Sequence, residues 1–139
     1  MTESVIAIDI GGTSIKFSLW QGTTLGPVKR FPTPATRDEF YAVIASGVAA
    51  VRGEATPIGI AISAPGAVNQ ASGVIEGDST IPYIHGFDFR AALTQRFKLP
   101  VTLENDANCA ALAEMQDGAG AGLHNALFVV IGTDVGGAV

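Results

Sequence analysis

Apolar and polar positions near the start of the chain follow the two-residue period of β-strands. Residues 5–10 are apolar apart from Asp9, which is typical of a buried strand, and residues 15–19 alternate between apolar and polar side chains. The Gly-Gly-Thr segment at 11–13 suits a tight turn between them. The pattern therefore predicts a hairpin, followed by a third strand over residues 25–31 that ends at a Pro-Thr-Pro segment.

Beyond the hairpin, the spacing of apolar residues alternates between helical and strand-like. The three expected helices cover residues 36–51, 88–97 and 105–116, and the three expected strands cover residues 58–62, 101–104 and 126–131. Strands and helices in this order predict an α/β fold in which helices flank a mixed sheet. Residues 64–80 are rich in glycine, serine and asparagine, so we expect a long loop there with at most a short hairpin.

The sequence stops soon after a glycine-rich turn. The last predicted strand runs into Gly132-Thr-Asp-Val-Gly-Gly137, and two residues follow that turn. A turn of this kind should lead into another strand. We therefore expect that strand to be missing and the fold to be incomplete.

Composition limits the classes of function. The 139 residues suit one domain, and 13 acidic against 8 basic side chains give a net charge of −5. The basic residues are scattered, which disfavours nucleic acid as a partner. No apolar run approaches the ~18 residues of a membrane span, and the first residues lack a basic segment, so we expect a cytoplasmic chain. The single cysteine, Cys109, excludes an internal disulfide.

Two glycine-rich turns carry the first candidate chemistry. In residues 9–13 a carboxylate ends a buried strand and glycines and a threonine follow, and residues 132–137 again place a threonine and glycines after an apolar strand. Amides of such turns can approach phosphate oxygens, and a nearby carboxylate can hold Mg²⁺ directly or through water. An ordinary hairpin turn explains either segment alone. Two such turns facing each other would clamp a polyphosphate.

A third polar segment lies where the strand at 101–104 ends and a helix begins. Asn105 and Asp106 place an amide beside a carboxylate at this point. Both residue types are favoured at a helix N-terminus for capping alone. A capping geometry can still leave the Asp106 carboxylate facing a cleft, where phosphoryl transfer to a hydroxyl needs a group that takes the proton.

Four segments together resemble successive motifs of the ROK family of sugar kinases, of the glucokinase type. They are residues 9–13, 64–68, 104–108 and 131–137, in the family's order and at its approximate spacing. The resemblance implies a ribonuclease-H-like domain of the actin and hexokinase ATPase type. It also implies that residues 1–139 are a truncated N-terminal domain, without the family's C-terminal domain and its zinc-binding His and Cys cluster.

The resemblance assigns roles to individual residues. It implies that the phosphates of ATP are bound by Asp9, Gly11, Gly12, Thr13, Thr133 and Gly136. Asp9 would also bind the Mg²⁺ ion. Sugar hydroxyls would be held by Gly66, Asn105 and Asp106, and Asp106 would be the catalytic base. An amide beside a carboxylate suits a sugar, because each ring hydroxyl both donates and accepts hydrogen bonds.

Three further positions bear on this resemblance. Thr80 stands where many family members carry asparagine, which leaves the identity of the sugar open. Asp134 stands at a position of the phosphate loop that is commonly glycine, and a carboxylate there repels phosphate unless it points away or meets a metal. His85 lies near Thr80, and a lone loop histidine is more often exposed to solvent than bound to a substrate.

The leading hypothesis is an ATP-dependent kinase that phosphorylates a hexose or glucoside, in a protein that forms homo-oligomers. The isolated 139 residues would turn over little or no substrate. The alternative is a sugar-sensing regulatory domain without catalysis, as in ROK-family repressors, which carry a helix-turn-helix segment ahead of this domain. The first predicted strand starts within five residues of Met1, and Asp9 and Asp106 are both present, which favours the kinase. A third hypothesis is a binding piece that associates through an open sheet edge.

Overall fold

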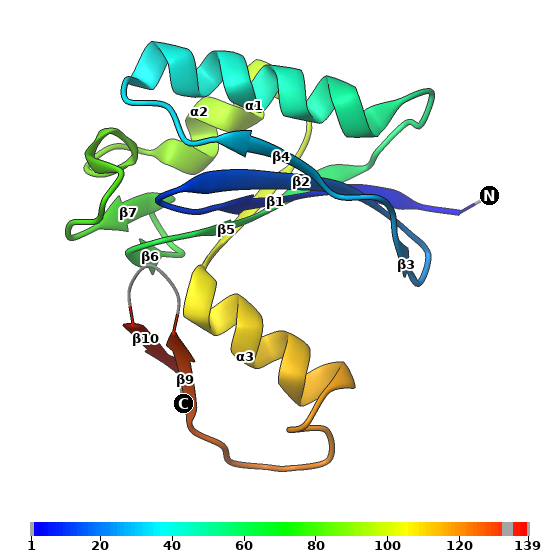
Figure 1. The fold of residues 1–139 in the computed structure, drawn as a ribbon, viewed down its shortest axis with the longest axis vertical. Helices are drawn as coiled ribbons and strands as arrows, with labels where there is room; N and C mark the ends of the chain where they lie inside the picture. The colour runs from blue at the N-terminus through cyan, green and yellow to red at the C-terminus, as the bar shows by residue number, and fades with distance from the viewer. Residues whose placement is uncertain (1, 132–134, 139) are drawn as a thin grey trace.

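The computed structural model describes residues 2–131 and 135–138 and centres on a six-stranded mixed sheet (Figure 1). The strands of this sheet are β1 (Ser4–Ile10), β2 (Ser14–Gln21), β3 (Thr24–Leu25), β4 (Lys29–Pro32), β5 (Gly59–Ala64) and β8 (Val101–Asn105). Their order is β3-β2-β1-β5-β8, and β4 also pairs with β2. Strands β1, β5 and β8 are parallel, whereas β2 is antiparallel to β1. The predicted α/β class with a mixed sheet is confirmed.

Three helices begin where the sequence places a capping residue. They are α1 (Arg37–Arg52), α2 (Phe89–Phe97) and α3 (Asp106–Asp117), and their N-caps are Thr36, Asp88 and Asn105. Each capping side chain accepts a hydrogen bond from a main-chain N–H of the first turn, which satisfies one of the free donors there. Each predicted helix therefore starts one residue later than predicted, because the predicted first residue is the cap.

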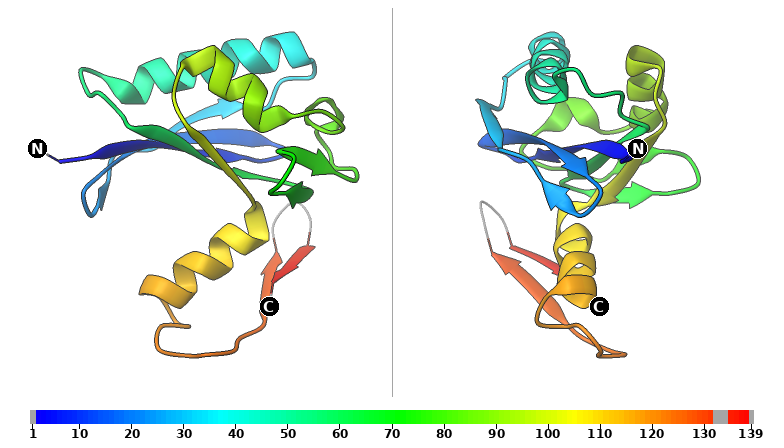
Figure 2. Two further views of the ribbon diagram at one scale, coloured as in Figure 1. Left: turned by 180° about the vertical axis from the view of Figure 1, so that it is seen from behind. Right: turned by 90° about the vertical axis from the view of Figure 1, so that its right-hand side faces the viewer.

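The helices α1 and α2 cover one face of the sheet (Figures 1 and 2). Alternate residues of the central strands point toward them and are buried, because successive side chains of a strand point to opposite faces. The core is contributed by Ile6, Ile8, Ile10, Ile15, Phe17, Phe40, Ile44, Ile60, Ile62, Phe89, Leu93 and Leu103, among others. Gly47 of α1 lies directly against the ring of Phe17, so this helix approaches the sheet closely.

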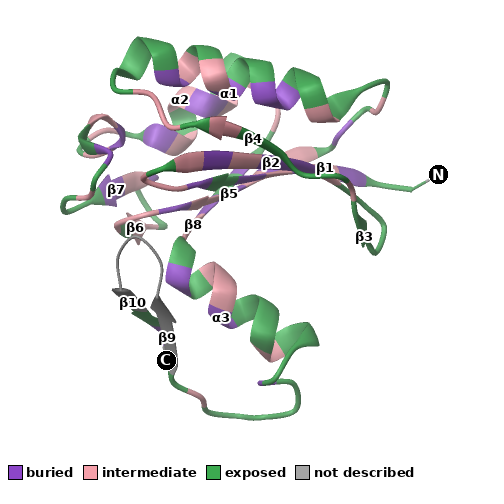
Figure 3. Ribbon diagram, in the orientation of Figure 1, coloured by how far each residue is buried: buried purple, intermediate pink, exposed green. Residues whose placement is uncertain are grey.

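The opposite face of the sheet carries small and polar residues. α3 leaves the end of β8 on this side, and the antiparallel pair of β9 (Phe128–Ile131) and β10 (Val135–Ala138) lies beside α3 (Figures 1 and 2). Much of the surface of α3 is exposed (Figure 3). This side of the sheet therefore forms a shallow space between strands and helix instead of a packed layer.

Two sequence expectations are corrected. The third strand predicted over 25–31 is split into β3 and β4, because Pro27 has no N–H for a continuous ladder. The strand expected to be missing after residue 137 is present as β10, since the small residues from Val135 onward pair with β9 instead of continuing the turn. The short hairpin allowed for within residues 64–80 is confirmed: it consists of β6 (Ala67–Asn69) and β7 (Val74–Glu76), and the 3₁₀ turn η1 (Pro82–Ile84) follows it.

Candidate functional site

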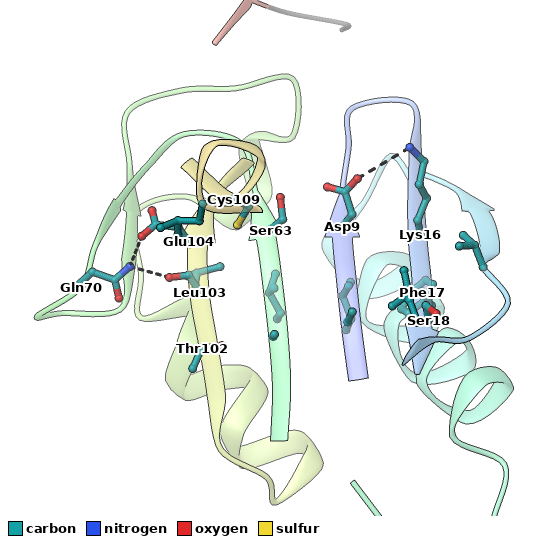
Figure 4. Close-up of a pocket in the computed structure, with 17 residues that line it drawn as sticks. Asp9, Lys16, Phe17, Ser18, Ser63, Gln70, Thr102, Leu103, Glu104 and Cys109 are labelled. Carbon is teal, nitrogen blue, oxygen red and sulfur yellow. Dashed lines mark hydrogen bonds and ion pairs between the residues drawn. The ribbon is translucent and has the colours of Figure 1, made fainter. Parts of the chain in front are cut away.

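The carboxyl ends of the parallel strands bring the candidate residues to one edge of the sheet. The strand register places Asp9, Ser63 and Glu104 in one row across β1, β5 and β8, and Lys16 continues the row on β2 (Figure 4). The turn after β1, the loop after β5 and the helix after β8 all start at this edge. In open α/β sheets this is where ligands bind.

The turn after β1 is braced from the side by Thr33. The N–H of Gly11 donates to the carbonyl of Ser14 at 3.0 Å, and a Cβ on Gly11 would lie 2.8 Å from that oxygen, so only glycine fits. Thr33 donates its N–H to the carbonyl of Thr13 at 3.0 Å and its hydroxyl to the carbonyl of Gly11 at 2.7 Å. These bonds engage two main-chain carbonyl oxygens of the turn and hold the turn against the end of β4.

Asp9 lies at the end of β1, beside this turn. Its carboxylate is 3.9 Å from the Lys16 ammonium, and the two side chains are 51% and 43% exposed. An ion pair this exposed is weak, so the Asp9 carboxylate is available to another ligand. Within residues 2–131 and 135–138, no group of three or more His, Cys, Asp or Glu could hold a metal ion. A single exposed carboxylate does fit a Mg²⁺ ion that arrives with phosphates and keeps several waters.

Gly66 follows β5 and has a backbone conformation that other residues rarely adopt. Its φ is +97°, and a Cβ would lie 2.7 Å from Ile75 Cγ2 and 2.8 Å from His85 Cε1. Its carbonyl accepts a hydrogen bond of 2.6 Å from Asn105 Nδ2. The loop that carries Gly66 is therefore fixed against the first residue of the β8 to α3 junction.

Asn105 and Asp106 form this junction. Asn105 Oδ1 accepts hydrogen bonds from the N–H groups of Ala107 and Asn108, while its Nδ2 donates to Gly66. The capping interpretation is thus confirmed, and one Nδ2 hydrogen remains besides the one that bonds to Gly66. Asp106 is exposed, and one of its carboxylate oxygens accepts from the N–H of Ala107 at 2.8 Å. This hydrogen bond orients the Asp106 carboxylate at the start of α3.

The sequence motif at 104–108 contains Glu104, to which sequence reasoning gave no role. Its Oε1 accepts from the N–H of Asn105 at 2.7 Å and from Asn108 Nδ2 at 3.1 Å. Its Oε2 accepts from Gln70 Nε2 at 3.2 Å, and Gln70 Nε2 also donates to the carbonyl of Leu103 at 2.7 Å (Figure 4). Glu104 therefore joins the β6 to β7 hairpin to the start of α3.

His85 packs against Gly66 from the other side and is only partly exposed, so its interpretation as a solvent-facing residue is corrected. Its Nδ1 lies 3.2 Å from the carbonyl of Ile75 and its Nε2 lies 2.6 Å from Ser79 Oγ. A carbonyl can only accept, so in the neutral imidazole Nδ1 carries the proton and Nε2 can accept from the serine hydroxyl. His85 thus connects the hairpin to residues 79–85.

A pocket of about 610 Å³ extends from this edge along the open face of the sheet toward α3 (Figure 4). Asp9, Ser63 and Glu104 line it at the strand ends, and Cys109 lines it from the helix. Burial, followed by the nearby Glu104, Asp9 and Asp106 carboxylates, raises the pKa of the Cys109 thiol, while a hydrogen bond with Ser63 opposes that rise. The pocket is therefore unfavourable to a further negative charge beside Cys109.

The structure brings together the three residues predicted to bind sugar and, separately, the residues of the first predicted phosphate turn. Gly66, Asn105 and Asp106 are adjacent, and Asp9, Gly11, Gly12 and Thr13 share the strand-end edge with them. Gly136 lies in β10, which packs beside α3. Thr133 and Asp134 fall outside the described residues. None of the helices described is long and apolar enough to cross a membrane.

Sequence comparisons find relatives that are named as sugar kinases. A family model described as ROK family matches residues 5–139. A β-glucoside kinase of Klebsiella pneumoniae is 36% identical over 137 residues, covering 97% of this chain and 45% of the relative. A glucokinase of Halalkalibacterium halodurans is 34% identical over 144 residues, covering 96% of this chain and 43% of the relative. The chain thus spans less than half the length of these relatives.

Solved structures agree with the fold. A ROK-family glucokinase from Streptomyces griseus in complex with glucose and AMPPNP has a TM-score of 0.87 at 29% identity, over 96% of this chain and 43% of that one. A ROK-family protein from Streptococcus pneumoniae in complex with sucrose has a TM-score of 0.80 at 44% identity, over 99% and 45%. A ROK-family transcriptional regulator, at 18% identity and a TM-score of 0.81, shares the fold alone. The expected hexokinase-type fold is confirmed.

Proposed function

This chain belongs to the ROK family, and from that premise we propose that it supplies the sugar-binding and phosphate-binding residues of an ATP-dependent sugar kinase. The observation that supports this most directly is the Gly66, Asn105 and Asp106 cluster. It offers one free amide hydrogen, a rigid loop and an oriented carboxylate at the strand-end edge. These groups suit a sugar hydroxyl that must be held and deprotonated.

In the proposed reaction the Asp106 carboxylate takes the proton of the acceptor hydroxyl. The hydroxyl oxygen attacks the γ-phosphorus of ATP, the bond to the β,γ-bridging oxygen breaks, and ADP leaves. The backbone amides of the turn at 11–13 would face the phosphates, and Asp9 would hold the Mg²⁺ that accompanies them and neutralises their charge. Gly136 and Thr133 are proposed to belong to the opposing phosphate loop.

The substrate is proposed to be a hexose or a glucoside. Glucose and β-glucosides are first choices because the named relatives are glucokinases and β-glucoside kinases. A homo-oligomeric assembly and a cytoplasmic location belong to the same proposal. We also propose that residues 1–139 correspond to the family's N-terminal domain and that this domain alone turns over little substrate.

A sugar-sensing regulatory domain is the second candidate, because a ROK-family transcriptional regulator has the same fold. The Asp106 carboxylate fits either candidate, because a carboxylate also accepts hydrogen bonds from the hydroxyls of a bound sugar. A sensor needs no polyphosphate or Mg²⁺ site, so the exposed Asp9 carboxylate beside the glycine turn favours the kinase.

The test is ADP release by the protein at its natural length, with ATP and a panel of hexoses, amino sugars and β-glucosides. Turnover with one sugar should fall by about a hundredfold or more in Asp106→Asn, since that is the usual contribution of a general base. Sugar binding by calorimetry without turnover would favour the sensor instead. Neither binding nor turnover with any sugar would refute both candidates.

A further inference from the structure

The loop between β6 and β7 is attached to β8 through the side chain of Gln70. Its Nε2 donates to the carbonyl of Leu103 at 2.7 Å and to Glu104 Oε2 at 3.2 Å (Figure 4). Both partners are acceptors, so the amide is oriented with its nitrogen toward them. A reversed amide would place three oxygens together. Two bonds from one amide therefore fix this end of the hairpin to the strand that leads to Asn105.

Glu104 cannot move away from Gln70 without losing other bonds. Its second oxygen is held by the N–H of Asn105 at 2.7 Å and by Asn108 Nδ2 at 3.1 Å. The carboxylate is therefore a fixed point between the hairpin and the first turn of α3. A hydrogen bond to a charged acceptor is stronger than one between neutral groups. Gln70 is thus anchored to the same junction that presents Asn105 and Asp106.

Further hydrogen bonds hold the loop between β6 and β7 together, so that fixing Gln70 also fixes the position of the hairpin. Within the loop, Asn69 Oδ1 accepts from the N–H groups of Ala71 and Ser72, and Arg90 donates to the carbonyl of Gln70 at 2.9 Å. The loop is therefore stiff. At its other end the hairpin is attached to the same junction by the bond from Asn105 Nδ2 to Gly66. Two attachments, one at each end of β6, join the hairpin to β8.

We infer that Gln70 and Glu104 are positioning residues, which together set where the loop at Gly66 stands relative to Asn105 and Asp106 and so determine affinity for the sugar. This inference rests on the proposed function. Neither residue needs to touch the sugar, since each acts through a neighbour in the cluster. Gln70 and Asp9 line the same pocket, but Gln70 is bonded to β8, and β5 lies between β8 and β1, which leads to the turn at 11–13. We therefore expect nucleotide binding to depend on Gln70 much less than sugar binding does.

The experiment compares Gln70→Met, Gln70→Lys and Gln70→Glu in the protein at its natural length. Methionine has a similar length but donates no hydrogen bond, lysine can donate to both acceptors, and glutamate brings a second carboxylate to Glu104. We expect Gln70→Met to raise the KM for the sugar by about three- to tenfold, the range for losing one or two such bonds. The KM of Gln70→Lys for the sugar should stay close to that of the wild type. The KM of Gln70→Glu for the sugar should be higher than that of Gln70→Met. The KM for ATP should change less than about twofold.

Gln95→Met is the matched control, because Gln95 is exposed on α2 and faces another part of the surface. A loop that is needed only for folding would be affected by lysine as much as by methionine, and equal effects of Gln70→Met and Gln70→Lys would refute the positioning role. Wild-type sugar affinity in Gln70→Met would refute it as well. An equal rise in the KM values for sugar and for ATP in Gln70→Met would also refute the positioning role.

A second readout separates this inference from the proposed function. Amide hydrogen exchange over residues 67–76, measured without any ligand, should be faster in Gln70→Met than in the wild type. Unchanged exchange would show that Gln70 does not hold the hairpin. If the wild type itself neither binds nor phosphorylates any sugar, the proposed function fails and the role in sugar affinity fails with it, whatever the exchange shows.

Discussion

The side-chain amide of Asn105 donates a hydrogen bond of 2.6 Å to the main-chain carbonyl of Gly66, 39 residues away in the sequence. The same side chain caps α3 through its Oδ1. One residue therefore starts the helix that carries Asp106 and fixes the loop proposed to contact the sugar. Separating these two tasks by mutation tests whether the contact matters for binding.

Asn105→Ser should separate them. Serine is as good an N-cap as asparagine, but its hydroxyl is too short to reach the carbonyl of Gly66. We expect a loss of about 1 kcal/mol or less in the free energy of unfolding, together with a rise of roughly tenfold or more in the sugar dissociation constant. Denaturant unfolding and calorimetric titration measure the two quantities. Asn105→Ala, which loses the cap as well, should be less stable than Asn105→Ser by about 1 kcal/mol.

Thr33→Val should weaken nucleotide binding and leave sugar binding alone. The substitution keeps the shape of the side chain but removes the hydroxyl that donates to Gly11 at 2.7 Å. The released carbonyl can then turn toward the phosphates, so we expect the KM for ATP to rise by about three- to tenfold, as for one lost hydrogen bond. Thr24→Val, an exposed position of β3, is the control. An equal change in the KM values for ATP and sugar would contradict this role.

Gly47→Ala should destabilise the fold. The added Cβ would overlap the ring of Phe17, which is fully buried in the core. Overpacking of this kind costs about 1–3 kcal/mol, and the gain of about 1 kcal/mol that alanine brings to a helix offsets part of that cost. We therefore expect a net loss of up to about 2 kcal/mol in the free energy of unfolding. Ser46→Ala, exposed on the same helix, should be neutral or slightly stabilising, and a stable Gly47→Ala would mean that α1 stands further from the sheet.

Cys109 should titrate above the ordinary thiol value of 9.0, because burial and the surrounding carboxylates raise its pKa. Alkylation rates measured against pH should therefore rise later than those of a free cysteine. Ser63→Ala should shift the profile further upward, since the hydrogen bond with Ser63 lowers the pKa. A profile at or below the ordinary value would contradict the half-buried position of Cys109 beside these carboxylates.

The same shift has a consequence for stability. Well below pH 9.0 the thiol is neutral in both states, and its contribution to stability is fully present. As pH rises through the raised folded pKa, the unfolded chain ionises first and that contribution is lost. Wild-type protein should therefore lose more stability at alkaline pH than Cys109→Ala. Tyr83, whose pKa is also raised by burial and by Glu39, is present in both and cancels in the comparison.

Local pattern in the sequence determined much of this protein. The apolar runs predicted β1, β2, β5 and β8, because the alternation of buried and exposed positions along a strand appears as a pattern of apolar and polar residues close together in the sequence. The capping residues Thr36, Asp88 and Asn105 marked the helix starts, since a cap acts within its own first turn. The glycine turn after β1 and the amide and carboxylate pair after β8 were visible for the same reason. The division of β3 from β4 and the extent of β10 could not be predicted in the same way, because these strands are short and their formation depends on pairing with β2 and β9.

The tertiary structure alone decided which distant groups hold the site in place. Thr33 braces the turn from 22 residues away, Gln70 reaches Leu103 across 33 residues, and His85 fills the space beside Gly66. Thr33 and Gln70 both donate to main-chain carbonyls, which every residue possesses. The residue types at positions 11 and 103 therefore could not predict these hydrogen bonds. The sequence shows which side chains can donate or accept a hydrogen bond. Only the folded structure shows which of many identical backbone groups each side chain contacts.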